Sequence, residues 1–176
     1  MQGKKLALCK ICYNVFVMDG KADIPMRSDC PVNFAVERIG DKWTLIVMRD
    51  ILFWGKQTYS DLLNRDERIA TNILASRLEY LEQQGLILRR PDPNDRRKEI
   101  FEPTERGIDL IPIIVEMVAW SAKHPDWHAL EPKGSPRQMR LVRRAVTTKN
   151  KYPTIKKFKE KVRNGGFIFE DIVEGN

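Results

Sequence analysis

Four small side chains at helical spacing would let a helix approach DNA and hydrogen-bond to base edges: Thr71, Asn72, Ala75 and Ser76. The apolar side chains of the same stretch fall on the opposite arc of a helical wheel: Ile73, Leu74, Leu78 and Leu81. A helix with a small, polar outward face fits a major groove about 12 Å wide. An ordinary amphipathic helix has the same pattern, so the neighbouring elements must decide.

A second group of residues suits contact with phosphates. Two β-prone runs at residues 86–90 and 99–102 flank the turn-rich segment 91–98, which predicts a β-hairpin. The tip of this hairpin carries three consecutive cations, Arg96, Arg97 and Lys98. The planar arginine fork suits phosphates or the minor groove, and Asp95 could pair with a nearby arginine. Any exposed hairpin can carry such charges, so this pattern alone does not establish DNA binding.

Metal and catalytic chemistry find little support in the chain. Cys9 and Cys12 have knuckle spacing, but no second pair follows, and the histidines are His124 and His128. No carboxylate pair, nucleophile with histidine or glycine-rich phosphate loop appears at a recognisable spacing. We expect no enzyme, no metal site and no cofactor.

A third cysteine occupies a chemically interesting position. Cys30 precedes Pro31, and Asp29-Cys30-Pro31 is typical of a helix start with proline at the first helical residue. The positive end of a helix favours the thiolate, so Cys30 is a candidate redox sensor. A small, inert capping residue would give the same pattern.

Composition indicates a globular protein with 42% hydrophobic and 31% charged residues. No apolar run approaches the roughly 18 residues of a membrane span, and no secretory signal is evident, so we expect a cytoplasmic protein without membrane contact. The net charge of +7 is uneven, because residues 133–163 contain twelve Lys and Arg against Glu160 as the one acidic residue. That segment is a second DNA contact or a solvated face.

The flanking pattern predicts a helix-turn-helix. A capping-box pattern at residues 58–61 opens a short helix to about residue 64, a polar turn follows, and the recognition helix spans about residues 70–84. The basic hairpin directly behind it is a wing. A last long helix runs from Thr104 to about Lys123 with a bend at Pro112.

Two helices are too apolar for a monomer of this size. The predicted helix over residues 42–53, capped by Asp41, is apolar around nearly its whole circumference, and the last long helix resembles it. We expect one face of helix 42–53 to pack on the core and another on a second subunit. Homodimerisation through N-terminal and C-terminal helices follows.

The composition divides the whole chain into three segments. Residues 1–29 form an extension of unknown role, residues 30–123 the winged helix-turn-helix domain, and residues 124–176 a basic C-terminal extension. In the last of these we expect basic helices over 137–149 and 155–162. The aromatic patch at 167–169 packs on the body or on a partner subunit.

An ordered set of motifs resembles the HxlR-type winged helix-turn-helix regulators, over about residues 30–123. They are Cys30-Pro-Val, Ile39-Gly-Asp-Lys-Trp-Thr-Leu45, Gly55, Tyr59-Ser-Asp-Leu62, Ile69, Leu74, Arg77-Leu78, Leu81-Glu82, Gly85-Leu86 and Thr104-Glu-Arg-Gly107. The wing motif also resembles that of the related MarR-type regulators.

The resemblance implies a fold that is mainly α with a small β-hairpin wing. It implies a dimeric, sequence-specific transcription regulator that binds double-stranded DNA at a palindromic operator, with repression as the expected mode. The alternative is a winged-helix module for protein contacts or for non-specific nucleic-acid binding. Some relatives sense oxidants through the cysteine that Cys30 matches.

Two details depart from the resemblance or qualify it. Ala70 stands where a small hydroxyl residue usually opens the recognition helix, so we expect Thr71 to take that role and shift the start by one. Arg77 lies within the apolar arc, so we expect its guanidinium to pair with Asp61 or Glu67 rather than reach a base.

Overall fold

The computed structural model describes residues 27–65, 67–124 and 148–170. The chain divides into two compact units, residues 1–34 and 35–176. The described elements are α2 (Pro31–Ile39), α3 (Lys42–Trp54), α4 (Tyr59–Leu63), α5 (Thr71–Gln83), β1 (Ile87–Pro91), β2 (Glu99–Pro103), α6 (Glu105–Ile108), α7 (Ile111–Ser121) and α10 (Tyr152–Arg163). None of the described helices combines the length and the apolar character needed to cross a membrane.

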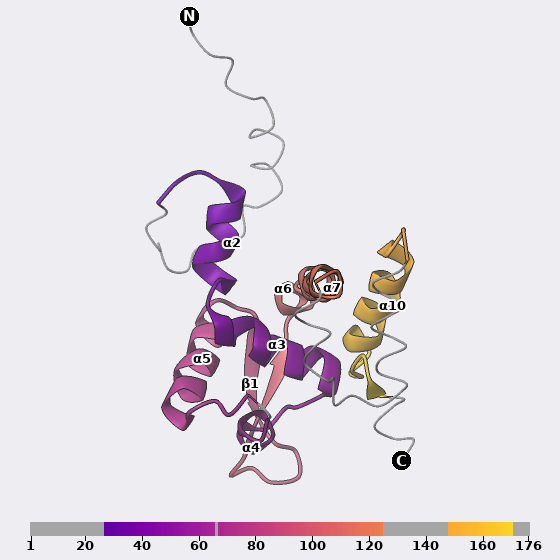
Figure 1. The fold of residues 1–176 in the computed structure, drawn as a ribbon. Helices are drawn as coiled ribbons and strands as arrows, with labels where there is room; N and C mark the ends of the chain where they lie inside the picture. The colour runs from indigo at the N-terminus through magenta and orange to yellow at the C-terminus, as the bar shows by residue number, and fades with distance from the viewer. Residues whose placement is uncertain (1–26, 66, 125–147, 171–176) are drawn as a thin grey trace, which may run out of the picture. The chain divides into compact units, whose positions relative to one another are not determined.

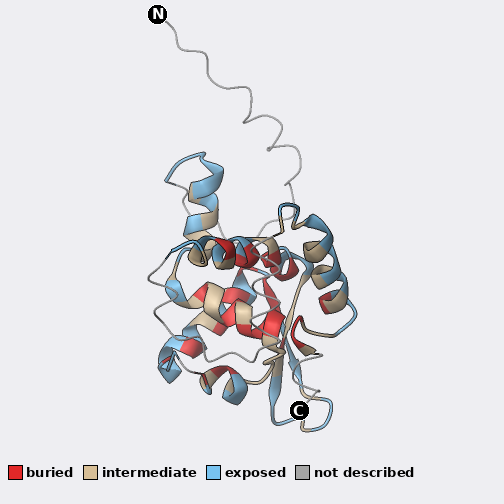
Figure 2. Cartoon of the chain, turned by 45° about the vertical axis from the view of Figure 1, so that its right-hand side comes forward, coloured by how far each residue is buried: buried red, intermediate tan, exposed pale blue. Residues whose placement is uncertain are grey.

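Helix α3 is the central element of the larger unit, with α5 on one side and α10 on the other (Figure 1). It begins where predicted, because the Asp41 carboxylate accepts the amide hydrogens of Trp43 and Thr44 at 2.9 and 3.0 Å. It ends at Gly55, whose φ of 64° lies in the left-handed region that glycine adopts readily. Val47, Met48 and other α3 side chains are fully buried, and the buried residues of Figure 2 gather along these central helices.

The helix-turn-helix consists of α4 and α5. Thr58 and Asp61 form the predicted capping box at the start of α4. The α5 helix packs through Leu74, Leu78 and Leu81, which are at most 1% exposed. Ile73, expected in the packed arc, is 37% exposed. The apolar face of α5 is therefore narrower than the sequence pattern indicated.

The expected shift at the start of α5 is wrong. Ala70 has extended backbone angles and its carbonyl accepts the amide of Leu74 at 2.9 Å, so it occupies the capping position itself. Its side chain cannot accept a hydrogen bond, and Thr71 is the first helical residue. The Tyr59 hydroxyl donates to the Thr71 carbonyl at 2.8 Å, which ties α4 to the beginning of α5.

The predicted hairpin is present as an antiparallel pair of strands, with Ile87 opposite Pro103 and Pro91 opposite Glu99. Ile87 and Phe101 are buried at its base. The segment before α4 extends this pairing, since the Phe101 amide donates to the Gln57 carbonyl at 2.8 Å. The wing is thereby attached to the start of the helix-turn-helix.

The single bent helix expected after Thr104 is instead two helices. Thr104 caps α6 as predicted, with its hydroxyl accepting the Gly107 amide at 3.1 Å, but α6 ends at Ile108. Pro112 lies in the first turn of α7, where the missing N–H removes no helical hydrogen bond. In the middle of one long helix it would have removed such a bond and clashed with the preceding turn.

The predicted helix around residues 155–162 is present as α10, and it packs on α3. The Phe53 ring meets those of Phe158 and Phe169 edge-on at 6.3 and 5.6 Å, and Trp54 meets Phe169 at 4.9 Å. The Phe169 amide donates to the Phe53 carbonyl at 2.9 Å, at the end of α3. The face of α3 expected to contact a second subunit is therefore covered by the chain itself.

Close packing at the end of α3 explains a second constraint on Gly55. A Cβ built there would lie 2.4 Å from the Phe167 ring, closer than real Cβ contacts come. Glycine is thus required for space as well as for backbone conformation. Of the two sites expected for the aromatic patch at 167–169, the body or a partner subunit, the structure shows packing on the body. The expected helix over residues 137–149 falls almost entirely outside the described residues.

Candidate nucleic-acid interface

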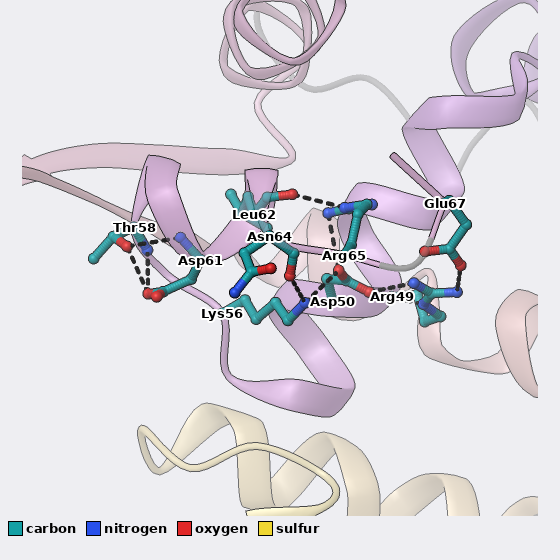
Figure 3. A network of polar contacts seen from close by, with 9 residues as sticks. All are labelled: Arg49, Asp50, Lys56, Thr58, Asp61, Leu62, Asn64, Arg65 and Glu67. Carbon is teal, nitrogen blue, oxygen red and sulfur yellow. Dashed lines mark hydrogen bonds and ion pairs between the residues drawn. The ribbon is translucent and has the colours of Figure 1, made fainter. Parts of the chain in front are cut away.

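A buried charged cluster positions the turn between α4 and α5 (Figure 3). Asp50 of α3 is 1% exposed, and its carboxylate lies 2.9 Å from Nη2 of Arg65, whose side chain is equally buried. Arg65 Nε donates to the Leu62 carbonyl at the end of α4 at 2.7 Å, and Lys56 Nζ donates to the Asn64 carbonyl at 2.9 Å. Arg65 and Lys56 therefore link backbone carbonyls at the end of α4 and in the turn to Asp50 of the core helix α3.

A second arginine extends the cluster towards the surface. Arg49 donates to Asp50 through Nε at 2.8 Å and to Glu67 through Nη1 at 2.6 Å. The Arg49 hydrogen bond holds the pKa of Glu67 below its ordinary value. Burial lowers the pKa of Arg65, while Asp50 beside it acts in the opposite direction. Arginine nevertheless stays protonated, so both guanidinium groups of the cluster are cationic at neutral pH.

The four predicted base-reading residues all lie on the exposed side of α5. Thr71, Asn72, Ala75 and Ser76 are exposed, whereas the leucines behind them are buried. The structure thus places small and polar groups together on one accessible face. Whether they contact bases is a proposal taken up below.

Arg77 has a different partner from the two predicted. Its Nη1 lies 3.2 Å from Asp41 Oδ2, and its guanidinium stacks on the Tyr80 ring at 5.1 Å. Asp61 is engaged in the capping box and Glu67 in the pair with Arg49, so neither is available. The expectation of a structural role agrees with this geometry, but the predicted partners are wrong.

Asp41 therefore serves two elements. Burial alone would raise its pKa, but hydrogen bonds from Thr44 and the Trp43 amide, with the charge of Arg77, hold the pKa below its ordinary value. The ionised carboxylate caps α3 and also fixes the middle of α5.

The three wing cations are exposed at the tip of the hairpin, and they differ in their pairing. Arg97 forms a forked contact with Asp95, at 3.0 Å from Nε and 3.2 Å from Nη2, as the sequence suggested. Lys98 Nζ lies 3.8 Å from the same carboxylate. Among the described residues, Arg96 makes no ion pair or side-chain hydrogen bond, so its guanidinium is the most available of the three.

Sequence reasoning missed the residue that joins the wing to α5. Arg89 of β1 lies 3.2 Å from Glu82 of α5 and 3.4 Å from Glu99 of β2, and it stacks over the Phe101 ring at 5.5 Å. Opposite charges at these positions were visible in the sequence, but only the hairpin register brings them together. Arg89 fixes the wing relative to the recognition helix.

The basic C-terminal part is largely neutralised where the structure describes it. Lys151, Lys159 and Arg163 pair with Glu116, Asp109 and Glu105 at 3.0, 2.6 and 2.9 Å. These cations dock α10 on α6 and α7 and leave less charge for a nucleic acid. The two expected roles of residues 133–163, a second DNA contact or a solvated face, stay predictions, and residues 133–147 lie outside the described residues.

Cys30 is exposed, and its carbonyl accepts the amide of Phe34 in the first turn of α2. This is the predicted position at a helix start. Within the described residues no group of three His, Cys, Asp or Glu side chains could hold a metal ion.

Two short helices joined by a turn, with an exposed second helix and a basic hairpin behind it, define the winged helix-turn-helix class of DNA-binding proteins. The model of the HxlR-like helix-turn-helix family matches residues 38–128. The chain belongs to this family, whose members are transcription regulators rather than enzymes, as the sequence predicted.

Relatives from bacteria and archaea agree with this assignment. A Mycobacterium tuberculosis (strain ATCC 25618 / H37Rv) protein described as an "uncharacterized HTH-type transcriptional regulator", Rv3095, is 33% identical over 109 residues, covering 62% of this chain and 65% of its own. The match thus spans less than two thirds of the mycobacterial relative. A Methanothermobacter thermautotrophicus (strain Delta H) protein described in the same words is 33% identical over 91 residues, covering 52% of this chain and 69% of its own.

The crystal structure of PA1607 is similar to this chain with a TM-score of 0.53 and 27% sequence identity. The similarity covers 62% of this chain and 72% of that one. It agrees with the predicted winged-helix fold.

The buried cluster generates a stability prediction. Asp50→Ala removes the carboxylate opposite a guanidinium that is 1% exposed, and we expect it to lower the free energy of unfolding by about 3–5 kcal/mol. Glu67→Ala, which removes the surface partner of Arg49, should cost about 1 kcal/mol or less. Urea denaturation followed by circular dichroism measures both, and similar losses for the two variants would show that burial of the Asp50–Arg65 pair is unimportant.

Proposed function

We propose that this chain is a sequence-specific transcription regulator that binds double-stranded DNA as a homodimer. In this proposal α5 lies in the major groove, where Thr71, Asn72, Ala75 and Ser76 face base edges. The observation that carries it is the exposed face of α5, whose small side chains stand on a helix held by three buried leucines.

The wing supplies the second contact in this proposal. Arg96, Arg97 and Lys98 at its tip reach the phosphate backbone or the minor groove beside each recognition helix. Asp95 supports this role because its paired contact orients the Arg97 guanidinium before DNA is bound. We expect Arg96 to contribute more to DNA affinity than Arg97, because Arg96 does not have to break an ion pair with a carboxylate before it binds a phosphate.

Base and backbone contacts are separated by two variants of the full chain. Asn72→Ala should cost about 1–3 kcal/mol on the preferred site and much less on random DNA, because a base contact is lost. Arg96→Ala should weaken binding to both DNAs and reduce the steepness of the salt dependence by about one phosphate contact. Fluorescence anisotropy on a site obtained by footprinting beside its own gene measures both effects.

A non-specific nucleic-acid module predicts the opposite pattern. Wild-type affinities for the preferred site and for random DNA would then be equal, and Asn72→Ala would behave like Arg96→Ala. A protein-interaction module would bind neither DNA at physiological salt.

The exposed apolar face of α7 supports the homodimer. Ile113, Met117 and Trp120 are 39%, 49% and 64% exposed, and their spacing places them on one side of the helix. Val36 of α2 is also exposed and supports a part for this helix in the interface. A two-fold dimer requires a palindromic operator with half-sites about one helical turn apart. Repression is the proposed mode, because a dimer on a promoter excludes the polymerase.

Replacing an apolar residue of this face tests the dimer. Met117→Glu should shift the chain from dimer to monomer in sedimentation equilibrium and weaken binding to a palindrome far more than to a half-site. Leu88→Glu introduces the same charge at an exposed apolar residue of β1, in the wing, and should leave the dimer intact. A monomeric wild type at micromolar concentration would refute the proposal.

Cys30 is the proposed site of a redox response. Its exposed side chain at the start of α2 supports access by an oxidant. We expect peroxide to lower the DNA affinity of the wild type at least severalfold and to leave Cys30→Ser unchanged. Equal responses of the two proteins, measured by anisotropy before and after reduction, would eliminate Cys30 as the sensor.

A further inference from the structure

The exposed face of α5 continues beyond the four predicted readers to a carboxylate. Glu79 follows Ala75 and Ser76 by one helical turn and is exposed, so it lies on the same face as Asn72. Gln83, one turn further, donates through Nε2 to Glu79 Oε1 at 3.4 Å. The outward face therefore carries an acidic group near its centre.

No lysine or arginine among the described residues pairs with Glu79. The neighbouring carboxylate of Glu82 differs, because Arg89 lies 3.2 Å from it. Ala75, Ser76, Glu79, Glu82 and Arg89 line one shallow hollow on the surface. Glu79 is thus the carboxylate at this hollow whose charge is left uncompensated.

An uncompensated carboxylate on a DNA-facing helix repels phosphates, so it weakens binding unless a base supplies a donor. A carboxylate only accepts hydrogen bonds. In the major groove cytosine presents an amino donor at N4, guanine presents two acceptors, thymine an acceptor and a methyl group, and adenine an acceptor beside its amino group. Cytosine is therefore the base that Glu79 accommodates best.

Resting on the proposed function, we propose that Glu79 is a specificity-determining residue that accepts a hydrogen bond from cytosine N4 in each half-site. The Gln83 amide donates to Oε1 of the Glu79 carboxylate, and the described residues show no hydrogen bond to Oε2. The small side chains of Ala75 and Ser76 leave room for the base edge. The same carboxylate excludes guanine at that position by placing acceptors opposite each other.

Selection from randomised duplex DNA tests this inference with the full chain. For the wild type we expect one position in each half-site where cytosine is preferred roughly tenfold or more over guanine. Glu79→Gln should lose that preference and admit adenine, because glutamine can bind its N6 and N7 together. The preferences at the other positions should remain.

Glu160→Gln is the matched control, since it makes the same change in charge at an exposed carboxylate of α10, outside the helix-turn-helix and the wing. It should keep the cytosine preference. Circular dichroism confirms that each variant is folded, as expected for exposed side chains.

The outcomes distinguish this inference from the proposed function. If the wild type enriches no sequence, the proposed function fails and the role of Glu79 fails with it. If the wild type enriches a motif that Glu79→Gln shares at every position, the regulator stands and Glu79 is only a repulsive charge. Loss of the cytosine preference in Glu160→Gln would likewise overturn the inference, because overall charge rather than contact would then explain it.

Discussion

The buried carboxylate of Asp50 is the constraint on which the helix-turn-helix depends. An ionised side chain that is 1% exposed is stable only beside compensating charge, and Arg65, Arg49 and Lys56 surround it. Arg49 and Lys56 each have a further partner in the segment between α4 and α5, and Arg65 belongs to that segment. Removal of the carboxylate therefore affects the turn as well as the core. Without Asp50 the buried Arg65 guanidinium has no opposite charge beside it, so the position in which it donates to the Leu62 carbonyl is less favourable.

Charged pairs also contribute to the docking of α10. The sequence concentrates cations in its C-terminal third, and that asymmetry pointed towards a polyanionic partner. In the described part, Lys159 and Arg163 instead face Asp109 and Glu105. Arg163 holds the pKa of Glu105 below its ordinary value through hydrogen bonds. These exposed pairs contribute little each, and the aromatic contacts of Phe53 with Phe158 and Phe169 supply most of the attachment.

Features that depend on neighbouring residues were predictable from the sequence. The Asp41 cap, the Thr58–Asp61 capping box and the paired strands each follow from residues a few positions apart. The partner of Arg77 was not predictable, because Asp41 lies 36 positions away and only the crossing of α3 and α5 brings them together. The packing of α10 and Phe169 on α3 was missed for the same reason. Apolar periodicity shows that a helix face is buried, but it does not show which segment buries it.

The prediction of a single bent helix failed for a different reason. Pro112 was correctly identified as an interruption, but proline is compatible with both a kink and a new first turn. Asp109 and Leu110 separate α6 from α7, so the proline stands in a new first turn. A Cβ at Gly107 would lie 2.1 Å from the Leu86 carbonyl oxygen, so α6 is held closely to the hairpin. Such a contact leaves no periodic signal in the sequence.

The recognition helix is consequently attached at three points along its length. The turn bound to Asp50 holds its beginning, the Arg77–Asp41 pair holds its middle, and the Glu82–Arg89 pair joins its last turns to the wing. All three contacts use side chains on the inner or lateral faces of α5, so the side chains of its outer face take no part in holding the helix. Because the helix is rigidly placed, residues such as Ala75 and Glu79 meet a base edge or a phosphate according to their position alone. Base preference in this domain is therefore a property of the exposed face, and the charged contacts behind it determine where that face points.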